Sequence, residues 1–113
     1  MPQSFDRNKF LERCMGNSIL VEKLIVTLRT TIPTEKAKLQ SAILAREYAE
    51  IARVAHQIRG TAANVCASPL SEAAHRLEQA AHENRYDVIA KPWLELSEQM
   101  DVLVHALAAE VQA

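Results

Sequence analysis

His56 is the residue of this chain whose type and surroundings point most directly to chemistry. It lies in the stretch AHQIRGTAANVCA, residues 55–67, three positions before Arg59 and four before Gly60. A neutral histidine side chain, which is well populated near pH 7, has one ring nitrogen free to act as a nucleophile. Attack on an activated phosphoryl group would give a phosphoramidate that can pass the group onward.

The helical pattern around His56 turns it toward solvent. At about 100° per residue, the apolar positions of a helix over about residues 47–66 fall within an arc of roughly 80° that faces the core. These positions are Ile51, Val54, Ile58, Ala62 and Val65. His56 points about 160° away from the centre of the arc, so it is not expected to be a core histidine.

Small residues surround His56 on this exposed face. Ala52, Gly60 and Ala63 lie one turn before it or up to two turns after it, where a solvated face ordinarily carries Lys, Glu or Gln. Glycine inside a helix lowers its stability by roughly 0.5–1 kcal/mol relative to alanine, so the presence of Gly60 calls for an explanation. We infer that the small residues let another macromolecule reach His56. The predicted docking surface is Ala52, Arg53, Gly60 and Ala63.

Two arginines, Arg53 and Arg59, lie on either side of His56. A guanidinium one turn away can neutralise part of the charge of a phosphoryl group, so Arg59 is predicted to stabilise that group. The sequence has no Walker-type Gly-Lys-Ser/Thr motif and no kinase-like loop. A nucleophile without such machinery indicates a carrier rather than an enzyme, so the partner must bring the metal and the electrophile.

The elements that position this site are all predicted to be helices. Strand alternation and hairpin signals are absent, and strong helix formers dominate. Ser4 is a candidate cap for a short first helix that ends near Met15, with Gly16 at its C′ position. A second helix begins at residue 17 or 18, and Pro33 either kinks it on its way to about residue 45 or divides it in two.

The second half of the chain carries clearer helix signals. Ser68 and Pro69 fit the cap and first residue of a fourth helix, which is predicted to end near Asn84. The last helix begins within residues 87–92 and carries an apolar seam at bundle spacing: Trp93, Leu96, Met100, Leu103 and Leu107. The prediction is an all-α, up-and-down four-helix bundle with a short additional N-terminal helix.

Composition limits the function further. The chain has 113 residues, which fits one small domain, with 13 basic and 14 acidic residues and no basic stripe that would indicate nucleic acid. Cys14 and Cys66 are predicted to be buried thiols rather than a disulfide. No apolar run is long enough to cross a membrane and no signal peptide is visible, so we expect a cytoplasmic domain without membrane contact.

The other histidines do not form a convincing metal site. Glu72 and His75 have the Glu-x-x-His spacing of di-iron bundles, but only one such pair is present and it is predicted to face outward. His75 and His82 are two turns apart, about 10 Å along a helix, which is too far for one ion. His105 is predicted to be an ordinary surface residue, and no metal ligand is assigned.

Residues 55–65, together with Leu70 and the pair Leu77-Glu78, resemble the signature of histidine-containing phosphotransfer (HPt) domains. The resemblance implies one HPt domain over residues 1–113, with His56 accepting the phosphoryl group through its outward ring nitrogen. Two positions depart from the usual pattern. Arg59 stands where the family usually has lysine, and Cys66 where it often has glycine.

The resemblance also implies partners. These are the receiver domains of a hybrid sensor histidine kinase and of a response regulator, between whose aspartates the domain would pass phosphate. It implies no cofactor of its own, with Mg²⁺ expected only on the receiver. The expected context is the cytoplasm, either as a free-standing carrier or as the cytoplasmic C-terminal part of a membrane-bound sensor kinase. We expect a monomer, since no second apolar stripe demands a dimer.

Two alternatives share part of this pattern. A non-phosphorylated HPt-like adaptor would bind receiver domains without carrying phosphate, but such a protein need not keep His56. The dimerisation helices of a sensor kinase would have an acidic residue after the histidine and a nearby proline. Here Gln57 follows His56, and no proline comes before Pro69 in this part of the chain.

Overall fold

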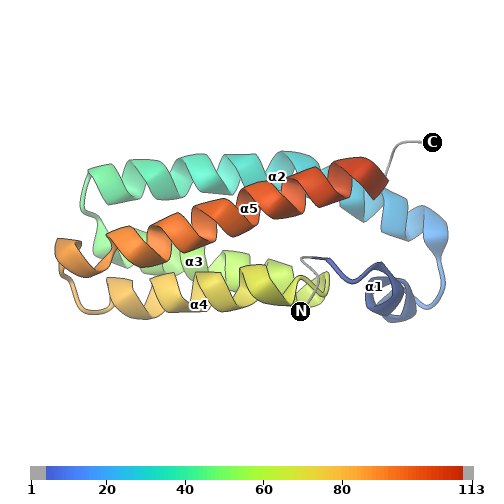
Figure 1. The fold of residues 1–113 in the computed structure, drawn as a ribbon, viewed down its shortest axis with the longest axis horizontal. Coiled ribbons are helices and arrows are strands. Elements are labelled where there is room, and N and C mark those ends of the chain that lie inside the picture. Colours follow the sequence, from blue (N-terminus) through green and yellow to red (C-terminus); the bar gives the residue numbers. More distant parts are fainter. Residues whose placement is uncertain (1–4, 111–113) are drawn as a thin grey trace.

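The computed structural model describes residues 5–110, which are helical apart from short turns. The elements are α1 (Arg7–Arg13), α2 (Ser18–Leu44), α3 (Tyr48–Asn64), α4 (Ser68–Ala81), the 3₁₀ helix η1 (Tyr86–Val88) and α5 (Ala90–Glu110). Helices α2 to α5 form an elongated up-and-down bundle, and α1 lies at the end where α2 begins (Figure 1). The predicted fold class is confirmed.

Helix α1 is capped by Asp6, whose carboxylate accepts a hydrogen bond from the Lys9 amide at 3.1 Å. The predicted cap, Ser4, lies outside the described residues. The helix ends at Arg13, two residues earlier than predicted. The C-cap is Cys14, so the C′ position belongs to Met15, with a left-handed φ of 58°, and not to Gly16 as predicted. Gly16 follows it with a φ of 77°.

Helix α2 runs through Pro33 as one helix, so of the two alternatives the division into two helices is wrong. Proline cannot donate the hydrogen bond that Arg29 would accept one turn earlier. Both residues are exposed, so water can satisfy the freed carbonyl. The long helix is therefore compatible with its proline.

The turn between α3 and α4 is longer than predicted, because α3 ends two residues before Cys66. Helix α3 ends at Asn64, and Cys66 adopts a φ of 60°, which is the left-handed region that glycine adopts most readily. The Ala67 carbonyl accepts the first bond of α4, from the Ser71 amide at 3.0 Å. Ala67 is therefore the N-cap, and the predicted cap Ser68 is the first helical residue, with its proline second.

The other end of α4 also differs from the prediction. The helix ends at Ala81, because the chain turns over the next three residues and Asn84 has a left-handed φ of 54°. Helix α5 begins at Ala90, inside the predicted window.

The core lies between the four long helices. All five predicted α3 core positions are buried, and so is the α5 seam except Trp93, which is only partly buried. Cys14 and Cys66 are free thiols, as predicted, but they are half-buried rather than buried because both lie in turns at one end of the bundle. This core fixes which face of α3 meets solvent.

Candidate functional site

His56 projects from the middle of α3 with 59 % of its side chain exposed. The prediction that it faces away from the core is confirmed. Its ring borders a shallow surface pocket between α3 and the end of α4, which Ala52, Arg53 and His82 also line. The imidazole is thus accessible from outside the bundle.

Glu78 of α4 orients the imidazole. Its Oε2 lies 2.9 Å from His56 Nδ1, and its side chain is only 16 % exposed. Arg59 Nη2 lies 3.3 Å from the same ring nitrogen. Nδ1 cannot donate to Glu78 and accept from Arg59 at once, and the shorter contact is with an ionised acceptor. We therefore assign the ring proton to Nδ1, which leaves the lone pair on Nε2.

Arg59 lies in the groove between α3 and α4 and is half-buried. Its Nη1 donates to His75 Nδ1 at 2.8 Å, and its Nε lies 3.7 Å from Glu78 Oε1. His56, Arg59, His75 and Glu78 form one connected group, called here the α3–α4 cluster. One cation and one carboxylate therefore flank the exposed imidazole.

Arg53, the second predicted cation, has a partner of its own. Its guanidinium forms two hydrogen bonds with the Glu50 carboxylate on the preceding turn. These bonds lower the pKa of Glu50 and raise that of Arg53. Arg53 lines the same pocket as His56, but its charge is already matched by this exposed ion pair.

The small residues of the predicted docking surface divide into two kinds. Gly60 and Ala63 are exposed, and a Cβ added to Gly60 would meet no atom within 4 Å. Ala52 is only 8 % exposed, so its prediction as an open surface position is wrong. The reason is the close packing of α4 over this turn of α3, which the pattern of α3 alone does not contain.

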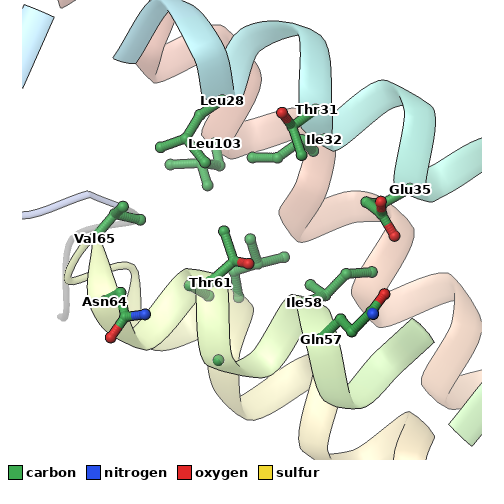
Figure 2. A pocket seen from close by; sticks show the side chains of 13 residues that line it. Leu28, Thr31, Ile32, Glu35, Gln57, Ile58, Thr61, Asn64, Val65 and Leu103 are labelled. Atoms are coloured by element: carbon green, nitrogen blue, oxygen red, sulfur yellow. The ribbon is translucent and has the colours of Figure 1, made fainter. Parts of the chain in front are cut away.

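A second depression lies on the other side of Gly60, between α2 and α3. Figure 2 shows side chains of the two helices facing each other across it. Its apolar lining includes Leu28 and Ile32 of α2 and Ile58 of α3, and its polar lining includes Gln57 and Thr61. Gly60 also lines this depression, only one turn along α3 from His56, so a partner that covers both must pass over it.

Sequence reasoning missed two members of the cluster. Glu78 belongs to the motif that carried the resemblance but was given no role, and His75 was expected only to face outward. Both lie on α4 and meet residues of α3. The available signal was the spacing of His75 and Glu78, which places them one turn apart on the same helix.

Among residues 5–110, no group of three or more His, Cys, Asp or Glu side chains is arranged to hold a metal ion. His82 and His105 are exposed. Within the same residues, no helix has the length and apolar character needed to cross a membrane.

Solved structures that share this fold include the following two. Histidine-containing phosphotransfer protein B from Pseudomonas aeruginosa matches with a TM-score of 0.86 and 15 % identity, over 95 % of this chain and 93 % of that one. The HPT domain of a sensor hybrid histidine kinase from Shewanella matches with a TM-score of 0.82 and 16 % identity, over 97 % of both chains.

The family of the chain can be assigned from sequence comparison. No curated protein is significantly similar to the chain. The family model of the Hpt domain, however, matches residues 23–113, which include α3, α4 and the whole α3–α4 cluster. The chain therefore belongs to the Hpt domain family, and it is a phosphotransfer carrier of two-component phosphorelays.

Proposed function

We propose that His56 is the residue that carries the phosphoryl group, through Nε2. The observation that supports this most is the 2.9 Å contact between His56 Nδ1 and the Glu78 carboxylate. It assigns the proton to the inner ring nitrogen, so the nucleophilic lone pair is on the other one. No other histidine of the described residues has a carboxylate within hydrogen-bond distance, since His75 lies 4.0 Å from Glu78.

The transfer step follows from this geometry. The Nε2 lone pair forms the N–P bond while the P–O bond to the receiver's aspartate breaks, and the aspartate leaves as a carboxylate. The phosphorylated ring, still protonated at Nδ1, is an imidazolium whose positive charge the Glu78 carboxylate stabilises. Arg59 offsets the negative charge of the phosphoryl group. The reverse step delivers the group to a second receiver.

The partners we propose are the receiver domain of a hybrid sensor histidine kinase and that of a response regulator, in the cytoplasm. Mg²⁺ would be bound by the receiver, where it neutralises phosphate charge during transfer. In this account the chain has no catalytic activity of its own. The exposed Gly60 and Ala63 leave room for the receiver's loops to approach the imidazole.

The test is phosphotransfer from ³²P-labelled receiver domains of the source organism, tried one at a time. Wild type should gain an acid-labile, base-stable label, and His56→Gln should gain none. His105→Gln, which changes another exposed histidine, is the matched control and should label normally. Both variants should retain the fold, because exposed substitutions usually alter stability by less than about 0.5 kcal/mol.

Two results would contradict the proposal. Acid-labile label that persists in His56→Gln would mean that another residue accepts the group. A wild type that binds receivers but never gains label would favour the non-phosphorylated adaptor.

A further inference from the structure

His75 is a member of the α3–α4 cluster that the transfer step does not use. It lies on α4, one turn before Glu78, and 45 % of its side chain is exposed. Its Nδ1 is 2.8 Å from Arg59 Nη1, which is the shortest contact that Arg59 makes among the residues described. This contact ties the side chain of Arg59 to the neighbouring helix.

The direction of this hydrogen bond is fixed by chemistry. A guanidinium has only donors, so His75 Nδ1 has to accept. His75 is therefore neutral in this arrangement, with its ring proton on Nε2. His56 has the opposite tautomer, because its Nδ1 donates to Glu78.

The remaining contacts of Arg59 do not hold it in place as firmly. Its Nε is 3.7 Å from Glu78 Oε1, beyond hydrogen-bond distance, and that oxygen is buried without a hydrogen-bond partner. Its Nη2 faces His56 Nδ1 at 3.3 Å, where the ring proton leaves no lone pair to accept. Within residues 5–110, His75 is thus the one acceptor that fixes the guanidinium beside the imidazole.

We propose that His75 is a positioning residue for phosphotransfer, whose neutral imidazole holds Arg59 against His56. The proposal rests on the proposed function, in which His56 carries the phosphoryl group and Arg59 stabilises its charge. A cation that is already in place when charge arrives stabilises it more effectively than one that must first be ordered. Without His75, the half-buried side chain of Arg59 loses this acceptor and gains rotamer freedom.

The test compares two variants of His75 in a rapid-quench phosphotransfer assay. His75→Leu removes the acceptor at similar volume and should slow transfer about fivefold, which is about 1 kcal/mol in the barrier. His75→Asn places an amide oxygen near the position of Nδ1 and should restore most of the rate. His105→Leu, an exposed histidine outside the cluster, is the control and should transfer at the wild-type rate.

A double-mutant cycle separates positioning from a purely structural effect. In an Arg59→Ala background, His75→Leu should cause no further loss of rate, because the residue through which it acts is gone. The proposal is wrong if His75→Leu transfers like wild type, or if it slows the Arg59→Ala variant by the same factor. If wild type gains no label at all, or His56→Gln still does, the proposed function fails whatever the His75 variants do.

An independent readout needs no variant. Imidazole ¹⁵N shifts at pH 8 should show His75 protonated at Nε2 and His56 protonated at Nδ1. A His75 ring protonated at Nδ1 could not accept from Arg59 and would overturn the proposal.

Discussion

The residues around His56 form a nearly neutral group before any phosphate arrives. Glu78 binds one ring nitrogen, Arg59 lies beside the same edge of the ring, and their opposite charges are 3.7 Å apart at their nearest atoms. A phosphoryl group adds negative charge at the exposed side of the ring. Arg59 should therefore contribute mainly during and after phosphoryl transfer, and little to the stability of the unphosphorylated fold.

Arg59→Ala should slow phosphotransfer about tenfold, which corresponds to about 1.4 kcal/mol of lost stabilisation. Arg59→Lys should be faster than Arg59→Ala, because an ammonium keeps the positive charge. It does not keep the planar fork with which the guanidinium lies beside both His75 and His56. Single-turnover transfer rates for the three proteins measure this. Equal rates for wild type, Ala and Lys would show that the cation has no role.

At the scale of elements, α3 shows what sequence periodicity can and cannot predict. Its apolar arc correctly identified the buried face and the exposed position of His56. Periodicity within one helix does not contain the register of its neighbour, however. For this reason Ala52 was wrongly placed at the surface, and the contacts of His75 and Glu78 with α3 were missed.

Helix boundaries were predicted less well for a related reason. Met15 and Cys66 adopt left-handed conformations, which could not be predicted from residues of these types. These conformations end α1 and α3 earlier than the sequence predicts. The sequence did not decide whether α2 is one helix or two, because whether a proline breaks a helix depends on whether the freed carbonyl can reach water.

Substitutions of Gly60 separate two effects, which are the room for a receiver domain beside His56 and the stability of the bundle. Gly60→Ala should stabilise the bundle by about 0.5–1 kcal/mol, because the added Cβ meets no atom and alanine is the better helix former. Gly60→Gln should remain folded but lose receiver affinity and transfer rate by about tenfold, or about 1.4 kcal/mol. Thermal unfolding and phosphotransfer measure the two effects. A stable Gly60→Gln that transfers normally would show that the open surface beside His56 has no function.

At the scale of the whole molecule, the bundle measures 44 × 22 × 21 Å and presents the His56 pocket and the α2–α3 depression on either side of Gly60. Among residues 5–110, the large exposed apolar side chains do not form one stripe. Met15 and Ile19 lie near the start of α2, whereas Leu44 and Leu94 line a pocket where α2 ends and α5 begins. Scattered apolar residues of this kind are common on monomeric proteins.

The isolated chain should therefore be a monomer that binds one receiver at a time. Light scattering at micromolar concentrations should give the 12.6 kDa mass of a single chain. A stable mass of twice that value would contradict this and would indicate that one of the apolar sets forms an interface.

The central claim concerns one atom, Nε2 of His56, and it can be tested at that atom. The chain is labelled with ¹⁵N, phosphorylated by a receiver domain, and examined by ¹⁵N and ³¹P NMR at alkaline pH, where phosphohistidine persists. The account predicts a single phosphohistidine, at His56, with phosphorus bonded to Nε2 and the proton retained on Nδ1. Phosphorus on Nδ1 of His56, or on His75, His82 or His105, would contradict it.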